Sequence, residues 1–453
     1  MYSDKTGLNE YVKSLCEEVT DEYRIPARYY VGDAVKRGLR NADGTGVMAG
    51  VTRVGSVQGY YMRDMEKLPI PGELYYRGIN VNDIVSNHAS MGTFGYEEVA
   101  YLLLFGKLPT RMQFRRFNNV LVSARQLPEG FFEDMILKAP SKDIMNKLER
   151  SVLVLYSYDD EPDSTAVENV MRQSIELIGC FPSIVANAYA VKHHVYDHGS
   201  LYIHNPDENL SVAENFLRMS RKDKSFTEEE ARLLDLMLIL HAEHGGGNNS
   251  TFACRTLTSS GTDTYSAIAA AVGSLKGPLH GGANAKVIAM ADYLDENVGP
   301  VNDENVRKLL IKILDREGGD RSGKIYGLGH AVYTVSDPRA QAIKKYARQI
   351  AEEKGFSRRF DLLETVERVG IPLLMEKTGR TLPMCANVDL YSGLVYSMLG
   401  IPQDLYTPLF AIARIAGWCA HRLEELITCG RIMRPAYRSS MRYGAYTPID
   451  ERE

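Results

Sequence analysis

The chain has 453 residues, of which 44% are hydrophobic and 25% charged, and its formal net charge at pH 7 is −5. This length and hydrophobic content are enough for a large core, and we expect more than one domain. Acidic and basic residues are interspersed, so the composition indicates no nucleic-acid-binding surface. An acidic substrate would have to be bound by local arginines rather than by a general positive field.

The cysteines and the N-terminus favour a cytoplasmic protein. The six cysteines form no CxxC pair and lie mostly in apolar or helical contexts, so we interpret them as reduced side chains rather than disulfides or zinc ligands. The first residues lack the apolar segment of a secretory signal, and no charge-free apolar run reaches membrane-spanning length. We therefore expect neither secretion nor a membrane-spanning segment.

In chain order, helical periodicity dominates, and a small extended patch interrupts it. Apolar residues between Leu8 and Val19 recur at helical spacing and predict a first amphipathic helix. Residues 44–82 are rich in glycine, and Val47, Ala49 and Val51 alternate, which predicts extended structure. Further helices are predicted over Tyr96–Phe105, closed by Gly106, and over residues 111–126, 141–158 and 164–191.

Capping signals mark several helix starts in the second half. Thr227 and Glu230 form a capping box at the start of a helix that is predicted to run to about His244. Asp337-Pro338 supplies an N-cap and a proline at the first helical position. The helix that begins at Pro338 is predicted to end at Gly355. Further helices are predicted over 283–294 and 390–399, and another over 409–429, with Thr407-Pro408 at its start.

One histidine, His280, lies in a glycine-rich turn (GPLHGGAN, 277–284) just before a predicted helix. Glycines allow a ligand to approach the backbone, and the positive end of a helix disfavours an imidazolium. We therefore expect His280 to be neutral near pH 7 and able to donate a hydrogen bond to a developing oxyanion. Taken alone, the stretch is equally compatible with a capped turn.

Two histidines, His241 and His244, lie three residues apart at the end of the helix that Thr227 opens, followed by Gly245-Gly246-Gly247-Asn248. They could form a polar wall of a substrate site, although histidines near a helix C-terminus more often satisfy its carbonyl groups. A zinc site is the weakest interpretation, because the sequence lacks the HExxH order. The role of Asn248 stays open.

A second histidine loop is YGLGHAVY (326–333), with Arg321 and Lys324 before it and Asp337 and Arg339 after it. Glycines, backbone amides and two cations suit a phosphate group, but the spacing does not match a dinucleotide-binding GxGxxG. By itself the segment is more typical of a tight structural loop.

Three charged residues near the C-terminus complete the candidates. Asp389 precedes an apolar helix and is either its N-cap or a general base. Arg414 lies within the apolar segment FAIARIAGW (410–418) with no acidic residue at i±3 or i±4, so its anion is distant in sequence or is a ligand. Arg434 by itself is typical of a solvated surface cation.

Taken together, these stretches resemble the citrate synthase family in content and order. The matching segments cover most of the chain: GELYYRGI (72–79), FGYEEVAYLLLFGKLPT (94–110), LILHAEHGGGNNST (238–251), GPLHGGAN (277–284), GLGHAVYTVSDPR (327–339) and ANVDLYSG (386–393), with Arg414 and Arg434. The resemblance implies a mainly α-helical two-domain fold with a small β patch near the N-terminus. The large domain would comprise residues 1–281 and 391–453, and a small mobile domain residues 282–390.

The resemblance also implies roles for the candidate residues in a condensation of acetyl-CoA with oxaloacetate. Asp389 would remove a proton from the acetyl methyl group. His280 would donate to the thioester oxygen and His330 to the oxaloacetate carbonyl. The substrate carboxylates would be bound by arginines, and His244 would also touch oxaloacetate. The implied arginines are Arg339, Arg414 and, from a neighbouring subunit of a homodimer or larger homo-oligomer, Arg434.

For coenzyme A, the resemblance implies the adenine-binding segment 324–329. The expected contacts are Arg321, Lys324, Ile325, Tyr326, Gly327, Leu328 and Gly329. Thr334 and Val335 stand where several relatives carry basic residues, so Arg321 and Lys324 are provisional choices for the phosphates. No metal and no cofactor beyond the acyl-CoA substrate are implied.

Three other functions compete with citrate formation. A 2-methylcitrate synthase would use propionyl-CoA with the same catalytic residues. A metal-dependent hydrolase built on His241, His244 and His280 and a non-catalytic helical scaffold are more distant alternatives. Thiol release from each acyl-CoA in the presence of oxaloacetate distinguishes all of them.

Overall fold

The computed structural model describes residues 25–30, 35–41, 44–64, 66–428, 430–441 and 444–452. The predicted first helix and the cysteines Cys16 and Cys429 lie outside these described residues. The chain divides into two units, one formed by residues 1–49 with 434–453 and the other by residues 50–433. In the first unit the short 3-10 helices are η1 (Ala27–Tyr30), η2 (Arg37–Leu39) and η6 (Ile449–Glu451). The second unit contains the strands, the described α-helices and all candidate site residues except Arg434.

The predicted extended patch is a three-stranded antiparallel sheet with strand order β1-β2-β3. Its strands are β1 (Gly55–Arg63), β2 (Glu66–Tyr76) and β3 (Ile79–Asn80). The register between β1 and β2 shifts between Gln58 and Tyr60, where Gly59 alone lies opposite residues 70–72, so the bulge is in β2. The alternation of Val47, Ala49 and Val51 does not form a strand, because the regular pairing begins only at Gly55.

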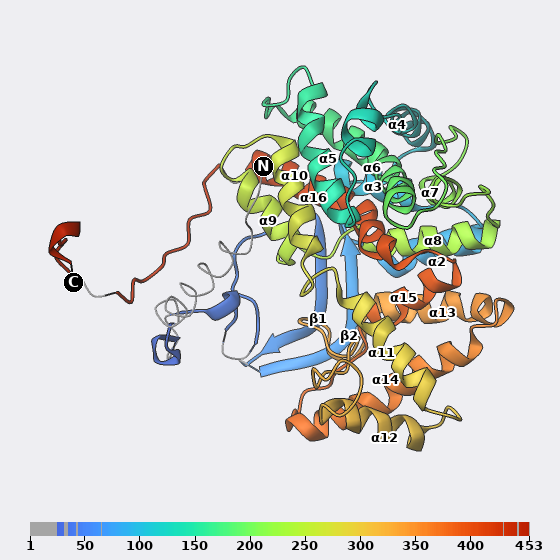
Figure 1. The fold of residues 1–453 in the computed structure, drawn as a ribbon, viewed down its shortest axis with the longest axis vertical. Helices are drawn as coiled ribbons and strands as arrows, with labels where there is room; N and C mark the ends of the chain where they lie inside the picture. Colours follow the sequence, from blue (N-terminus) through green and yellow to red (C-terminus); the bar gives the residue numbers. More distant parts are fainter. Residues whose placement is uncertain are drawn as a thin grey trace. The chain divides into compact units, whose positions relative to one another are not determined.

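The rest of the second unit is mainly α-helical, as predicted (Figure 1). The described α-helices are α2 (Val81–Met91), α3 (Tyr96–Phe105), α4 (Arg111–Ser123), α5 (Ile144–Leu155), α6 (Val167–Tyr196), α7 (Val212–Ser220), α8 (Glu228–His241), α9 (Asn249–Thr258), α10 (Thr264–Lys276), α11 (Ala283–Asn297), α12 (Asp303–Leu314), α13 (Pro338–Glu353), α14 (Ser357–Thr378), α15 (Asp389–Met398) and α16 (Tyr406–Thr428). Shorter turns are the π-helix η3 (Phe132–Leu137) and the 3-10 helices η4 (Tyr156–Tyr158) and η5 (Gln403–Leu405).

Helix ends with a local signal are where the sequence predicts them. Helix α3 ends at Gly106, which adopts a left-handed backbone with φ of 77°. The Thr227 hydroxyl accepts from the Glu230 N–H and completes the capping box of α8. Asp337 caps α13 and Pro338 occupies its first turn.

One predicted helix start is wrong, and of the two interpretations of Asp389 the helix cap is not observed. Helix α16 begins at Tyr406, as a continuation of η5, and not at a Thr407 cap; the Thr407 hydroxyl instead donates to the Gly281 carbonyl at 3.0 Å. Asp389 does not cap α15 but is its first residue, and the N-cap is Val388 without a side-chain cap hydrogen bond. In both cases a tertiary contact or the preceding turn determines where the helix begins. Neither can be recognised from the local sequence pattern.

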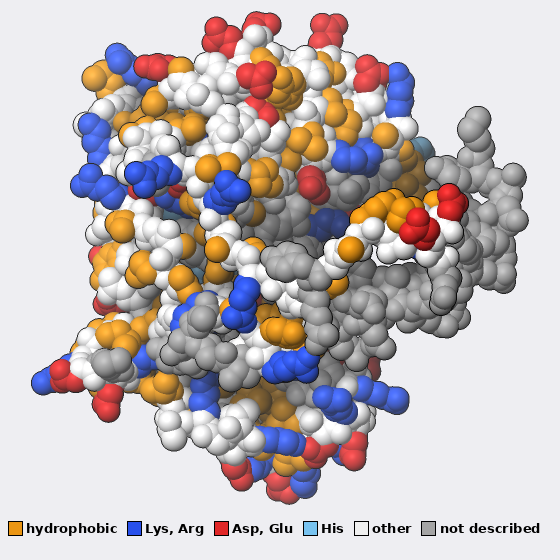
Figure 2. Space-filling view, turned by 90° about the vertical axis from the view of Figure 1, so that its left-hand side faces the viewer, with side chains coloured by type: hydrophobic (Ala, Val, Ile, Leu, Met, Phe, Trp, Pro, Cys, Tyr) orange, Lys and Arg blue, Asp and Glu red, His pale blue; other side chains and the backbone are white. Residues whose placement is uncertain are grey.

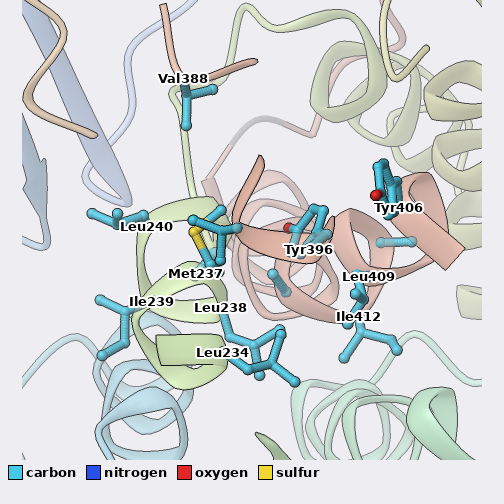
Figure 3. Close-up of a cluster of buried hydrophobic side chains, with 14 of the residues drawn as sticks. Leu234, Met237, Leu238, Ile239, Leu240, Val388, Tyr396, Tyr406, Leu409 and Ile412 are labelled. Atoms are coloured by element: carbon cyan, nitrogen blue, oxygen red, sulfur yellow. The ribbon is translucent and has the colours of Figure 1, made fainter. Parts of the chain in front are cut away.

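The core of the second unit is built around α8 and α16. Helix α16 contacts α3, α6, α8, α9 and α10. Figure 3 shows part of this core, in which α8 contributes Leu234, Met237, Leu238, Ile239 and Leu240, and Leu409 and Ile412 come from α16. Because α8 ends in this core at His241, the loop that carries His244 starts from a rigid position.

Helices α11–α15 pack on one another in the part of Figure 1 that lies below α8 and α2. Helix α13 also contacts α8, α2 and β2, and α15 contacts α8. Helices α11–α14 make up most of the segment predicted as a small domain, residues 282–390, and α15 enters that segment only with its first two residues. Its independent movement stays a prediction.

Helix α6 is long and apolar enough to cross a membrane by length and composition alone, but 78% of its apolar window is buried within the fold. It contacts α16, α7 and α5, which is the environment of a core helix. The four described cysteines, Cys180, Cys254, Cys385 and Cys419, are buried and free, as the sequence predicts. On the described part of the face in Figure 2, Lys and Arg side chains are interspersed with acidic and hydrophobic ones.

Candidate active site

A short antiparallel contact brings the two halves of the site together. Leu328 forms a β-bridge with Ala386, the Gly329 N–H donates to the Cys385 carbonyl at 2.8 Å, and the Asn387 N–H donates to the Gly327 carbonyl at 2.9 Å. Both glycines have positive φ, 81° and 90°, which a side chain would strain. The contact places the loop of His330 beside the start of α15, where Asp389 lies.

The His330 ring is held in one tautomer by its own loop. The backbone N–H groups of Val332 and Tyr333 both donate to its Nδ1 at 3.0 Å. An atom that accepts two N–H groups carries no proton, so the ring proton lies on Nε2. His330 therefore presents an N–H donor on the edge opposite to its own loop.

His244 lies next to His330, with their ring centroids 5.2 Å apart and their planes nearly perpendicular. Burial lowers the pKa of His244 well below its ordinary value, and the charge of Arg339 lowers it further. The neutral ring has a buried Nε2 without a hydrogen-bond partner. An unpaired buried nitrogen is costly in a folded protein, so this atom is typical of one that meets a ligand.

Two arginines are buried in this region, and Arg339 has a carboxylate partner. Its Nε donates to Asp337 Oδ1 at 3.0 Å and its Nη2 to Oδ2 at 2.7 Å. Although burial opposes the charged form, Asp337 raises the pKa of Arg339 above its usual range. This pair occupies one edge of the guanidinium, so a ligand carboxylate would meet its Nη1 side.

Arg414 is buried as well, at 1% exposure, but its hydrogen bond goes to a neutral group. Its Nε donates to the His241 carbonyl at 2.6 Å, and its guanidinium lies 4.7 Å from the centre of the Phe410 ring. Burial lowers the pKa of Arg414 to about 10, with Arg339 acting in the same direction and Glu243 opposing both. The Glu243 carboxylate is itself bonded to His421 at 2.9 Å. The surroundings of Arg414 therefore favour an anion, and a ligand as that anion stays a prediction.

His280 approaches this cluster from the turn before α11. Its Nε2 lies 3.3 Å from the Ser250 N–H and 3.0 Å from the Ser250 hydroxyl. Because Nε2 accepts the backbone N–H, the ring proton lies on Nδ1. Burial, with a smaller contribution from the Arg414 charge, lowers the pKa of His280 to about 4. The predicted neutrality of His280 is supported, with burial rather than the helix end as its main cause, and its role as a donor stays a prediction.

Asp389 supplies the carboxylate of the site. Burial raises its pKa to about 6, since Asp337 adds to the effect and Arg339 only partly opposes it. Its backbone N–H donates to the Asn387 side chain at 3.0 Å, which fixes the start of α15. At pH 7 about nine tenths of this group is ionised, and it is a stronger base than an ordinary aspartate.

The predicted coenzyme A segment forms a loop at the side of this cluster. Arg321 and Lys324 are exposed, and Ile325 is buried in the core of the small-domain segment. The Tyr326 hydroxyl donates to Asp320 Oδ2 at 2.6 Å. Gly327, Leu328 and Gly329 form the bridge to residues 385–387. The structure therefore gives the last three residues a positioning role and leaves both cations accessible.

Arg434 is exposed and belongs to the first unit of the chain, whereas the other candidate residues belong to the second unit. Its assignment to a neighbouring subunit's site stays a prediction.

The contacts of His241 and Asn248 are those of structural residues. His241 Nδ1 bonds the Met237 carbonyl at 2.8 Å, and burial lowers its pKa to about 3. Asn248 caps α9 by accepting from the Thr251 N–H, and its amide donates to the Gly245 carbonyl at 2.6 Å. Among the described residues, no group of three or more His, Cys, Asp or Glu side chains is arranged to hold a metal ion.

Sequence reasoning missed two contributors. Tyr333 stacks on His330 at 4.6 Å and lies edge-on to His244 at 5.6 Å. Glu243 accepts from the Gly245 N–H at 2.6 Å and so shapes the turn after His244. The only indication in the sequence was that each of these residues lies close to one of the two histidines. Burial and side-chain contacts cannot be read from the amino-acid sequence.

Comparisons with known proteins identify the family to which the chain is similar. Residues 43–436 match the family model described as "Citrate synthase, C-terminal domain". The chain is 34% identical to citrate synthase of Haloferax volcanii, covering 84% of this chain and 93% of the relative. It is also 34% identical to 2-methylcitrate synthase 1 of Corynebacterium glutamicum, covering 85% and 92%.

Among solved structures, the citrate synthase of Pyrobaculum aerophilum matches with a TM-score of 0.75 and 28% identity over 92% of this chain and 95% of that one. A ternary complex of carboxymethyl coenzyme A and oxaloacetate with the citrate synthase of Thermoplasma acidophilum matches with a TM-score of 0.75 and 27% identity, covering 93% and 100%.

Proposed function

Because this chain belongs to the citrate synthase family, we propose that it condenses acetyl-CoA with oxaloacetate and hydrolyses the citryl-CoA product to citrate and coenzyme A. One observation carries the proposal: two histidines with defined N–H donors, a carboxylate with a raised pKa and two buried arginines lie close enough to act on one another electrostatically. Acid–base carbon chemistry on a dianionic substrate requires this combination.

The first step would be proton removal by Asp389 from the acetyl methyl group. The electron pair of the broken C–H bond forms the enolate, and its negative charge develops on the thioester oxygen. His280, neutral and with its proton on Nδ1, donates to that oxygen. A neutral donor suits this step, because an imidazolium would be acidic enough to transfer its proton outright.

The enolate carbon would then attack the keto carbon of oxaloacetate. His330 donates a hydrogen bond from Nε2 to the keto oxygen, which takes up the negative charge as the carbon–carbon bond forms and is then protonated by this Nε2 proton. Arg339 and Arg414 bind the two carboxylates of oxaloacetate, and His244 Nε2 contacts the same substrate. Water then cleaves the citryl-CoA thioester and releases the thiol.

Several features of the proposal depend on the family alone. They are a homodimer or larger homo-oligomer in which Arg434 reaches the neighbouring site, closure of residues 282–390 over oxaloacetate, and coenzyme A contacts along residues 321–329. Closure would exclude water before the enolate forms. Mixed oligomers test the first point: an Arg434→Ala chain should regain activity when it is combined with an inactive Asp389→Ala chain.

The second candidate is 2-methylcitrate formation from propionyl-CoA, because relatives with that name are as similar as citrate synthases. Thiol release with acetyl-CoA or propionyl-CoA in the presence of oxaloacetate decides between them. We expect acetyl-CoA to have the higher kcat/KM, by about tenfold or more, since one methylene is worth that much in a fitted pocket. A preference for propionyl-CoA would select the alternative, and no thiol release with either would refute both. Chelator-sensitive activity would revive the metal-dependent hydrolase.

A further inference from the structure

Tyr333 is the one tyrosine of the described site whose buried hydroxyl has no hydrogen-bond partner. The residue is 1% exposed, so solvent does not compensate for the missing bond. Other tyrosines buried to the same degree bond within the protein: the Tyr76 hydroxyl donates to the Ile239 carbonyl at 2.8 Å and the Tyr96 hydroxyl to the Ile412 carbonyl at 2.6 Å. The chain thus satisfies buried phenols elsewhere, and the open Tyr333 hydroxyl requires a specific reason.

Two glycines of the sheet make room for this tyrosine. A Cβ on Gly59 would lie 2.6 Å from Tyr333 Cα, and a Cβ on Gly72 would lie 2.6 Å from Tyr333 Cδ1. The same strands hold the loop from outside, because the Thr334 hydroxyl donates to the Gly59 carbonyl at 2.6 Å and the Gly72 N–H donates to the Ser336 hydroxyl at 3.1 Å. Residue 333 is therefore fixed by β1 and β2, and its ring has little freedom to turn away.

The ring of Tyr333 lies among the groups that would bind the four-carbon substrate. It stacks on His330 at an interplanar angle of 26°, faces the edge of His244, and has the Arg339 guanidinium 5.8 Å from its centre. Its own N–H is one of the two that set the His330 tautomer. The unpartnered Nε2 of His244 lies in the same group. Two unpaired buried polar atoms in one cluster point to a shared polar ligand.

We infer that the Tyr333 hydroxyl is a further substrate-binding group, which donates a hydrogen bond to an oxygen of the oxo-dicarboxylate held by Arg339 and Arg414. The inference rests on the proposed function and names an additional recognition residue for it. Burial raises the pKa of Tyr333 well above its ordinary value, so the phenol stays protonated and able to donate. The ring orients His330, and the hydroxyl provides the contact.

Tyr333→Phe tests the inference because it removes only the hydroxyl. We expect the oxaloacetate Kd, measured by calorimetry without acyl-CoA, and the oxaloacetate KM to rise about tenfold or more, as for a lost hydrogen bond to a charged oxygen. The acetyl-CoA KM should change less than twofold. Tyr202→Phe is the matched control, since its hydroxyl donates to the Ser220 carbonyl at 3.1 Å on another part of the fold; it should leave both constants unchanged.

Thermal unfolding supplies a second readout. Without ligand, Tyr333→Phe should unfold at the wild-type temperature or above it, because the removed hydroxyl has no partner to lose. With saturating oxaloacetate, the rise in unfolding temperature should be smaller than for the wild type. A variant that is destabilised without ligand would show that the hydroxyl has a partner within the protein, and would overturn the inference.

The remaining outcomes separate this inference from the proposed function. An oxaloacetate Kd within twofold of the wild type in Tyr333→Phe, with an active wild-type enzyme, overturns the role of Tyr333 alone. A wild-type protein that neither binds oxaloacetate nor releases thiol overturns the proposed function and the inference with it.

Discussion

Replacing Asp389 with asparagine should make the protein more stable and catalytically inactive. The carboxylate is held in a site where burial raises its pKa from the ordinary value of 3.8 to about 6. That difference corresponds to about 3 kcal/mol of unfavourable free energy for the ionised group in the folded state at pH 7. Partial exposure of the residue screens the charge, so about 3 kcal/mol is an upper limit. Asparagine has nearly the same shape without the charge.

The size of the stability difference depends on pH in a defined way. The folded-state pKa lies above the unfolded-state pKa, so the destabilisation falls to about a fifth of its full value by pH 4 and is absent below about pH 3, where both states bind the proton. It grows as the pH rises and is nearly complete above about pH 6. The stability difference between Asp389→Asn and the wild type should therefore be positive at pH 7 and about a fifth as large at pH 4.

Urea denaturation at these two pH values, with thiol release in parallel, is the assay. Asp337→Asn is the matched control with the opposite sign: Asp337 is paired with Arg339 through two hydrogen bonds, so its loss leaves a buried cation unpaired and should cost about 3–5 kcal/mol. If Asp389→Asn is no more stable than the wild type at pH 7, or keeps its full advantage at pH 4, the electrostatic reasoning about Asp389 is wrong.

Three further predictions follow from the same geometry. On the acid side of the pH profile, kcat/KM should reach half of its maximum near pH 6, because activity rises as Asp389 ionises. His280 has a pKa of about 4 and does not change its protonation state in this range. A midpoint near pH 4 in the measured rate profile would contradict the prediction. Arg414→Met should fold, because the guanidinium that it removes is hydrogen-bonded to a carbonyl and leaves no carboxylate without its partner. The substitution should raise the oxaloacetate KM at least tenfold. An unchanged KM in steady-state kinetics would show that Arg414 is not part of the site. Gly59→Ala should lower the free energy of unfolding, measured by urea denaturation, by about 1–3 kcal/mol and should lower kcat, because its Cβ would meet the Val332 carbonyl at 2.5 Å. Gly50→Ala is the control: nothing described lies within 4 Å of its Cβ, so this variant should behave as the wild type.

Helix starts and ends with a local chemical signal could be predicted from the sequence alone. The capping box of Thr227, the Asp337-Pro338 start of α13 and the Gly106 end of α3 are all formed by groups within four residues of each other. The candidate residues could likewise be chosen from their residue types and their order along the chain. An arginine within an apolar segment and histidines among glycines can be recognised in the amino-acid sequence. The predicted start of α16 was wrong, because the helix continues from η5 and does not begin at a Thr407 cap.

The chemistry of those residues was decided only by the tertiary structure. The sequence indicated Asp337 as a helix cap, but the fold also pairs it with Arg339 and makes it accept the Val388 N–H at 3.2 Å, 51 residues away. The proton of His280 is placed by Ser250, which lies 30 residues earlier. Charge state, tautomer and hydrogen-bond partner depend on which groups surround an atom within a few ångströms and on how much water is excluded. Segments distant in the sequence set both of these, so the sequence indicated the candidate residues, whereas the fold determined their protonation states.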